Sequence, residues 1–114
     1  MNEPAQVPGV DATEAARLAE AGHVLLLDVR EDDEWASGHA PQASQTVLGQ
    51  LDPTAVPRDR PVIAVCRSGT RSTQATHALL AAGVEVRNLT GGMQAWAAAG
   101  LPVVRADGGP GEII

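Results

Sequence analysis

The sequence predicts an α/β domain with a mainly parallel sheet and helices on both of its faces. Short apolar runs at residues 24–28 and 62–65 have the length of buried strands. Polar loops follow these runs and lead into segments in which apolar residues recur at helical spacing. Strands and helices that alternate in this way are typical of a parallel sheet whose connecting helices cover both faces.

Length and charge restrict the domain organisation and the classes of partner. Residues 1–114 have the length of a single domain, with a core expected at about residues 10–104. Residues 105–114 contain three glycines and a proline, so they are expected to form a flexible tail. The 14 acidic residues outnumber the 8 basic ones, which disfavours nucleic acid as a partner. No apolar run approaches the roughly 20 residues that span a bilayer, so we expect no membrane partner.

Cysteine usage and the first residues indicate the compartment. Cys66 is the single cysteine of the sequence, which excludes an internal disulfide bond and fits a reducing environment. Residues 1–4 are polar and acidic and lack the pattern of a secretory signal. We therefore expect a cytoplasmic location.

The first half of the chain contains recognisable helix and strand signals. Asp11, with Glu14 three residues later, predicts a capping box at the start of a helix that ends near Ala21. Residues 49–60 contain two prolines and several polar side chains, which predict a loop. The other elements expected here are a short edge strand near Val7, strands at 24–28 and 44–48, and a short helix at 32–37.

The second half is organised around residues 61–72. Val62–Val65 predicts a buried strand, and a helix is expected from Ser72 to about Ala82, where Gly83 ends it. A further strand is expected at 84–89 and a last helix at 93–99. The glycines at 91 and 92 allow a close approach of two backbones, so this turn should lie beside the loop that follows Val65.

Cys66 therefore lies at the carboxyl end of a strand, just before a helix. Backbone N–H groups in such a turn have no partner within the helix, and the helix dipole adds partial positive charge. Arg67 and Arg71 add two full charges. All of these favour the thiolate, so we expect a pKa below that of a free cysteine and a nucleophilic sulfur. A buried structural cysteine is the alternative, but two arginines and a polar loop are unusual surroundings for an inert thiol.

Three ordered motifs resemble the rhodanese-type sulfurtransferases. The loop Cys66–Ser72 resembles the active-site loop of that family, and the other two motifs lie on either side of it. They are Leu25–Glu31 with Glu34, Trp35 and Gly38–Pro41 before the loop, and Leu89–Trp96 after it. The resemblance extends from about residue 10 to residue 104 and implies a five-stranded rhodanese-type domain. Two positions depart from the family pattern, because Ala40 and Gln42 stand where isoleucine and glycine are usual.

The resemblance implies a sulfur-transfer reaction at Cys66. The thiolate would take the outer sulfur of an anionic donor such as thiosulfate, and the resulting persulfide would pass it to a thiol or to cyanide. No metal or organic cofactor is implied, and a sulfur-relay protein is a further candidate partner. The expected anion-binding loop consists of Arg67, Ser68, Gly69, Thr70 and Arg71, and the expected supporting residues are Asp28, Arg30 and Ser72.

Individual roles within this site follow from charge and position. Arg67 is the candidate for the anionic donor, and Arg71 is expected to brace the loop. Asp28 is expected to hold Arg71 or to order the backbone of the loop; the alternative is a cap of the helix at 32–37. His39 is expected to be structural, because transfer to an ionised cysteine needs no general base.

Two other functions use the same cysteine. A phosphatase or arsenate reductase would use the same thiolate, but four residues between Cys66 and Arg71 make a loop one residue shorter than in the related cell-cycle phosphatases. A non-catalytic persulfide carrier or partner-binding module would use the same loop chemistry and receive its sulfur from one protein donor. The short loop disfavours the phosphatase, whereas the sequence alone does not separate the carrier from the free sulfurtransferase.

Overall fold

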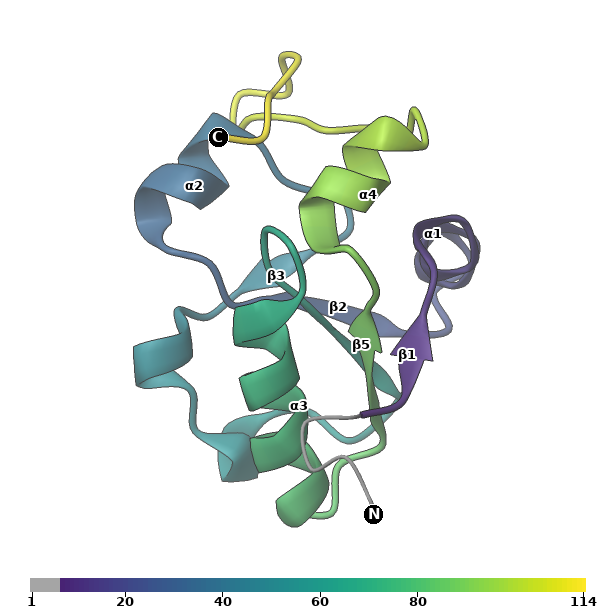
Figure 1. The fold of residues 1–114 in the computed structure, drawn as a ribbon, viewed down its shortest axis with the longest axis vertical. Coiled ribbons are helices and arrows are strands. Elements are labelled where there is room, and N and C mark those ends of the chain that lie inside the picture. The colour runs from purple at the N-terminus through teal and green to yellow at the C-terminus, as the bar shows by residue number, and fades with distance from the viewer. Residues whose placement is uncertain (1–6) are drawn as a thin grey trace.

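The computed structural model describes residues 7–114, which form one five-stranded sheet with helices on both sides (Figure 1). The strands are β1 (Gly9–Val10), β2 (Leu25–Asp28), β3 (Ser44–Gln45), β4 (Val62–Val65) and β5 (Val86–Leu89). The helices are α1 (Ala12–Glu20), α2 (Asp32–Ser37), α3 (Thr70–Ala81) and α4 (Gly92–Ala98), with two short 3₁₀ helices, η1 (Leu48–Gln50) and η2 (Pro53–Ala55).

The strand order is β1-β5-β4-β2-β3, and every pair of neighbours in the described sheet is parallel. The predicted fold class is therefore confirmed. β4, which precedes Cys66, occupies the centre, with β2 on one side and β5 on the other. Because all carboxyl ends point the same way, the loops after β2, β4 and β5 meet at one edge of the sheet, where ligands bind in open α/β folds.

Alternate side chains of the central strands enter two separate cores. Leu26, Ile63 and Val65 pack with α1 and α4, while Leu25, Leu27, Val62 and Ala64 pack with α3 and η1. The period of two residues along a strand produces this division. Cys66 belongs to the second core, so its side chain lies on the α3 side of the sheet.

Most predicted elements are present in the structure, and several of their ends differ by a few residues. The edge strand is Gly9–Val10, not a strand at Val7, and the third strand ends at Gln45 before η1 begins. At the start of α1, Asp11 accepts a hydrogen bond from the Glu14 N–H at 2.8 Å, which is half of the predicted capping box. α3 begins at Thr70, not Ser72, because Gly69 takes a left-handed conformation and caps the helix two residues earlier.

The carboxyl-terminal segment lies against α2. The composition of residues 105–114 predicts a flexible tail, whereas the structure describes a turn that returns to the body of the domain. The N–H of Gly111 donates to the Val103 carbonyl at 2.9 Å, and the N–H of Glu112 donates to the Ser37 carbonyl at 2.9 Å. Ile113 packs against the core shared by α1 and α4. These contacts bring the end of the described chain to the edge of the sheet that carries Cys66.

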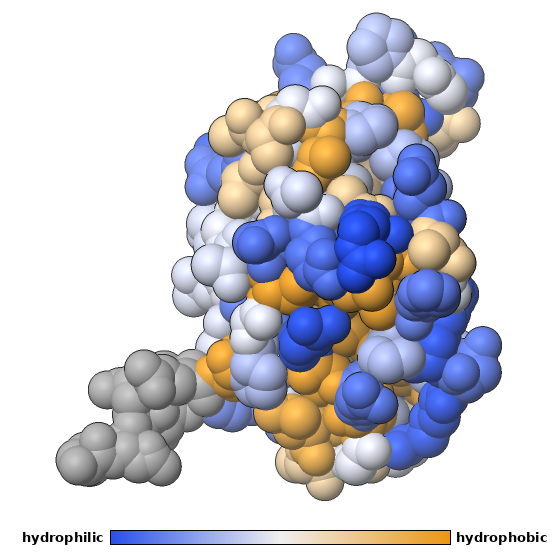
Figure 2. All heavy atoms as spheres, turned by 90° about the vertical axis from the view of Figure 1, so that its right-hand side faces the viewer, coloured by the Kyte–Doolittle hydropathy of each residue, from blue (hydrophilic) through white to orange (hydrophobic). Residues whose placement is uncertain are grey.

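Several alanines are among the exposed apolar residues. In Figure 2, hydrophobic residues reach the surface between charged side chains on the side that carries α1 and β1. Among residues 7–114, the large hydrophobic side chains that are exposed are Leu80 and Ile114, which lie on different elements. None of the helices described between residues 7 and 114 is long and apolar enough to cross a bilayer.

Candidate active site

Cys66 lies at the carboxyl end of β4, and its side chain is enclosed by the loop that follows. The residue is only 1% exposed. The N–H of Gly69 donates to Sγ at 3.0 Å, which closes the loop around the sulfur. Gly69 has φ +111°, a conformation that side-chain-bearing residues rarely adopt, and this conformation turns its N–H inward. The loop therefore presents backbone donors to a single, central sulfur atom.

The start of α4 binds the backbone of the cysteine loop. The N–H of Met93 donates to the Cys66 carbonyl at 2.8 Å, and the N–H of Gln94 donates to the Arg67 carbonyl at 2.9 Å. A Cβ atom on Gly92 would lie 2.5 Å from both carbonyl oxygens, so only glycine permits this approach. With its carbonyls bound to α4, the loop has its N–H groups free to face the sulfur. The predicted contact between the two loops is confirmed.

The Cys66 thiol has a pKa below its ordinary value. Burial acts in the opposite direction and raises the pKa, but hydrogen bonds to the sulfur outweigh it. They come from the Ser72 hydroxyl and from the backbone of Ser72, Gly69 and Ser68. The predicted lowering of the pKa therefore rests chiefly on hydrogen-bond donors, which solvate the thiolate in place of water.

A polar network connects the sulfur to β5. The Ser72 hydroxyl lies 3.3 Å from Cys66 Sγ and 2.5 Å from Asn88 Oδ1. The amide nitrogen of Asn88 donates to the Thr73 hydroxyl at 3.1 Å, and that hydroxyl donates to the Gly69 carbonyl at 2.7 Å. Asn88 is level with Ala64 on the neighbouring strand, close below the loop. Asn88 is a site residue that was not predicted from the sequence, although its position just before the Leu89–Trp96 motif is a signal that could have indicated it.

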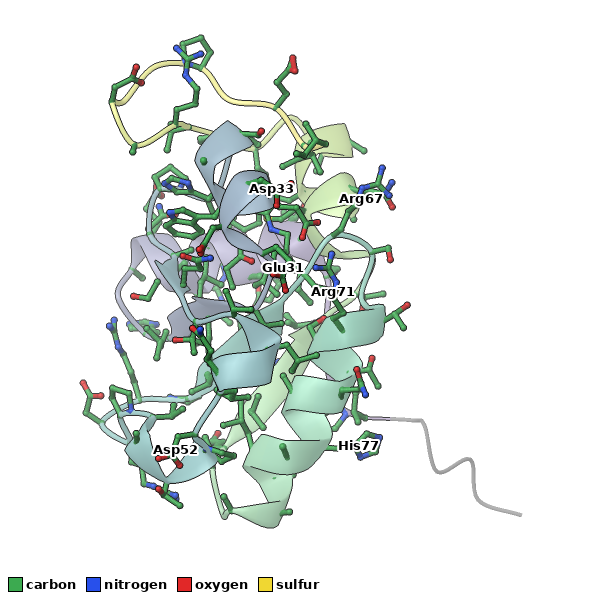
Figure 3. All side chains as sticks on the ribbon, turned by 90° about the vertical axis from the view of Figure 1, so that its left-hand side faces the viewer. Glu31, Asp33, Asp52, Arg67, Arg71 and His77 are labelled. Atoms are coloured by element: carbon green, nitrogen blue, oxygen red, sulfur yellow. The ribbon has the colours of Figure 1, made fainter. Side chains whose placement is uncertain are left out.

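Arg71 is bound to Glu34 of α2. Two hydrogen bonds of 2.6 and 2.8 Å join the guanidinium to the carboxylate, and the Glu34 side chain is only 13% exposed. Figure 3 shows Glu31, the residue before α2, close to Arg71. The hydrogen bonds from Arg71 lower the pKa of Glu34 to about 2, so this carboxylate is ionised at neutral pH. Arg71 therefore braces the loop against α2.

Arg67 projects from the outer side of the loop and is exposed. Its Nε donates to the Ile114 carbonyl at 2.7 Å. The amide oxygen of Gln94, when oriented toward the guanidinium, accepts from Nη1 at 2.9 Å. Arg67 therefore links the cysteine loop to α4, through Gln94, and to residue 114.

The sequence predicted that Asp28 could hold Arg71, but the structure shows a different partner for Asp28. It forms an ion pair of 2.8 Å with Arg30, and both side chains are completely buried. Arg30 also donates to the Gly38 carbonyl at 2.8 Å. The nearer arginine binds Asp28 because Asp28 and Arg30 are only two residues apart and point to the same side of the chain. Asp28 and Arg30 thus stabilise the turn between β2 and α2 and not the cysteine loop itself.

His39 and His77 lie in different surroundings. His39 Nδ1 lies 2.9 Å from the Trp35 carbonyl, and the His39 ring stacks on the Trp35 ring with 3.7 Å between centroids. This geometry agrees with the structural role predicted for His39. His77 is exposed on α3 and lies away from Arg67 and Arg71 in Figure 3. Residues 7–114 contain no group of three or more His, Cys, Asp or Glu side chains that could hold a metal ion.

An open groove of about 600 Å³ runs beside the loop and along α3. Ser68, Gly69 and Thr70 form one wall, and Asn88 and Thr90 form another. The groove gives a small molecule access to the mouth of the loop. His77 of α3 also lines the groove, and none of its lining residues is acidic.

Cys66, whose sulfur accepts hydrogen bonds, lies in a short loop between β4 and α3, and comparisons with known proteins give the family of the chain. The rhodanese-like domain profile matches residues 11–99, most of the chain. The chain belongs to the rhodanese-like domain family. The predicted family is thus confirmed, and the rhodanese-like match includes β2, the loop and α4, the parts that build the site.

Individual relatives cover almost the whole rhodanese-like domain. A protein named sulfurtransferase from Allochromatium vinosum is 45% identical over 96 residues, which cover 81% of this chain and 89% of that protein. A thiosulfate sulfurtransferase from Arabidopsis thaliana is 34% identical and covers 86% of this chain and 84% of its own. The crystal structure of a rhodanese-related protein from Thermoplasma volcanium superposes with a TM-score of 0.80 at 26% identity, covering 86% of this chain and 98% of that one.

Proposed function

We propose that this rhodanese-like domain is a sulfurtransferase that carries sulfur as a persulfide on Cys66. The enclosure of Cys66 Sγ by backbone donors of a short loop is the observation that supports this most directly. A thiolate stabilised in this way is nucleophilic at neutral pH. The names of the relatives from Allochromatium vinosum and Arabidopsis thaliana point to the same chemistry.

In the first step, the Cys66 thiolate attacks the outer sulfur of the donor. With thiosulfate, the bond between the two donor sulfurs breaks, and sulfite leaves with its electron pair. The cysteine then carries one additional sulfur with a negative charge. No proton has to move, so the step needs no general base, and no such base faces Sγ among its hydrogen-bond partners.

The loop stabilises the persulfide that results. The donors around Cys66, which include the Gly69 N–H at 3.0 Å, are available to the charge on the outer sulfur. Ser68 and Thr70 line the groove beside the loop and add hydroxyl donors at its mouth. Arg67 is exposed there and would meet the anionic donor, while Arg71, held by Glu34, keeps the loop in shape.

In the second step, an acceptor removes the outer sulfur. A thiolate or cyanide attacks the outer sulfur, and the Cys66 thiolate leaves and is restored. We propose a thiol as the acceptor in the cell, supplied by a small molecule or by a sulfur-relay protein. The single cysteine and the reaction through a free thiolate fit a reducing compartment such as the cytoplasm.

Intact-mass spectrometry tests this function. Purified protein treated with thiosulfate is expected to gain the mass of one sulfur atom, and cyanide is expected to remove it and release thiocyanate. Cys66→Ser should show neither change. If the wild-type protein gains no sulfur from thiosulfate or from a persulfide donor, the proposal is wrong, and phosphate and arsenate substrates should be tested next.

A further inference from the structure

The carboxyl-terminal hairpin, residues 103–114, lies beyond the part of the chain that matches the family profile. It folds back on itself through an antiparallel bridge between Val104 and Pro110. The N–H of Glu112 donates to the Ser37 carbonyl at 2.9 Å, which binds the hairpin to the end of α2. The family match assigns no role to this hairpin, although it is bound to an element beside the cysteine loop.

Two glycines allow the hairpin to approach α2 closely. A Cβ atom on Gly111 would lie 2.8 Å from the Gly38 Cα atom and 2.9 Å from the Ser37 carbonyl oxygen. A Cβ atom on Gly38 would lie 2.7 Å from the backbone nitrogen and oxygen of Glu112. The φ of Gly38 is 170°, an extended conformation that any residue adopts, so space and not backbone conformation requires glycine there. A side chain at either position would push the hairpin away from α2.

The end of the hairpin holds Arg67 of the cysteine loop. Ile113 packs against the core shared by α1 and α4, and the oxygen of the next residue, Ile114, accepts a hydrogen bond of 2.7 Å from Arg67 Nε. The Gln94 amide oxygen, when oriented toward the guanidinium, accepts from Nη1 at 2.9 Å and from Nη2 at 3.3 Å. These contacts use three of the five N–H groups of a guanidinium, so two remain for a substrate.

We infer that the carboxyl-terminal hairpin positions Arg67 beside the mouth of the cysteine loop, so that an anionic donor meets a guanidinium that is already in place. An exposed arginine without such contacts occupies many rotamers, and ordering it during binding weakens the affinity. Gly111 and Ile113 are then positioning residues that act through Arg67 and do not touch the reacting sulfur. The inference rests on the proposed sulfurtransferase function where the donor is concerned, whereas the order of Arg67 is measured independently of it.

Gly111→Ala is the variant that displaces the hairpin. The added Cβ atom would meet backbone atoms at 2.8–3.0 Å, so the backbone itself has to move. We expect the Glu112 amide and the Arg67 Nε–H to exchange with solvent faster than in the wild type, which nuclear magnetic resonance measures. Ile113→Ser loosens the same segment through lost packing and should have the same effect on Arg67.

Steady-state kinetics with thiosulfate and cyanide measure the effect on the donor. We expect Gly111→Ala to raise KM for thiosulfate about three- to tenfold and to change kcat less than about twofold, because the ordering of one long side chain weakens binding by about this factor. Gly108→Ala is the matched control in the same hairpin. Its φ of +85° strains the turn, while nothing lies within 4 Å of the added atom. This variant should leave KM unchanged.

The Arg67→Gln background separates positioning from a general loss of structure. There, Gly111→Ala should have no further effect on KM, while it still lowers the unfolding temperature. The inference is wrong if Gly111→Ala raises KM by the same factor with and without Arg67, or if the Arg67 Nε–H exchanges equally fast in the wild type and in both hairpin variants. The proposed function fails separately, if no donor places sulfur on Cys66 of the wild-type protein, and the exchange of the Arg67 Nε–H still tests the inference in that case.

Discussion

The Ser72 hydroxyl stands between the amide oxygen of Asn88, 2.5 Å away, and the sulfur of Cys66, 3.3 Å away. A hydroxyl has one proton, so Ser72 donates to only one of them at a time. When Cys66 is a thiolate, the sulfur becomes the more strongly charged acceptor. Asn88 therefore holds Ser72 in place and competes for its proton.

Ser72→Ala is expected to raise the pKa of Cys66 and to slow its reactions. A hydrogen bond to a charged group is worth about 1.5–3 kcal/mol, so formation of the persulfide at neutral pH should fall about ten- to a hundredfold. The pH dependence of Cys66 alkylation by iodoacetamide measures the pKa directly. Asn88→Ala, which removes the competing acceptor, should not raise it.

Thr76→Val provides the control for that prediction. Thr76 is buried one turn later on α3, and its hydroxyl donates to the Ser72 carbonyl at 2.7 Å, away from the sulfur. This variant should leave the alkylation profile unchanged. An equal shift in Thr76→Val and Ser72→Ala would mean that the helix moves as a whole and that the hydroxyl has no specific effect on the thiolate.

Removal of Arg30 should destabilise the whole domain. Asp28 and Arg30 are fully buried, so Arg30→Ala leaves an unpaired carboxylate in the core, at a cost of about 3–5 kcal/mol. Urea unfolding followed by circular dichroism measures the loss. Removal of both charges in Asp28→Asn with Arg30→Met should cost less than Arg30→Ala alone, and the opposite order would contradict the ion-pair explanation.

Gly92→Ala is expected to disturb the cysteine loop through direct contact. A Cβ atom at this position would lie 2.5 Å from the carbonyl oxygens of Cys66 and Arg67, and φ is +59°. We expect both lower stability and slower sulfur transfer. Gly100→Ala is the matched control, because its φ of +76° imposes similar backbone strain while nothing lies within 4 Å of the added atom. Gly100→Ala should lower stability and leave transfer intact.

Acid should weaken the ion pair between Glu34 of α2 and Arg71 over a defined range of pH. The pKa of Glu34 is lowered from 4.5 to about 2 by Arg71, so the stabilisation is complete above pH 4.5. It is lost as the pH falls through about 2, where the folded protein also binds the proton. The difference in unfolding midpoint between wild type and Glu34→Gln should therefore be constant from pH 7 to about 5 and narrow below it. A difference that does not change down to pH 2 would contradict the assignment.

Most helices and strands could be predicted from local patterns in the sequence. Val62–Val65 was predicted to be a strand and Asp32–Ser37 a helix, and the structure has both. Both predictions succeeded because short apolar runs and capping residues act over a few neighbouring residues. The first residue of α3 was harder to predict, because a glycine at position 69 indicates a turn but does not show which residue begins the helix. The glycines at 91 and 92 correctly indicated that two loops meet.

The sequence by itself determined that Cys66 stands at the end of a buried strand, in a short loop with donors on every side. Tertiary structure alone decided which partners the charged and polar side chains have. Glu34 reaches Arg71 across 37 residues, and Asn88 reaches Ser72 across 16, because parallel strands bring distant segments to one edge of the sheet. Asp28 forms an ion pair with Arg30 in the core, because a buried carboxylate needs a partner. The pairs of Glu34 with Arg71 and of Asn88 with Ser72 depend on packing, which no local spacing of residues encodes.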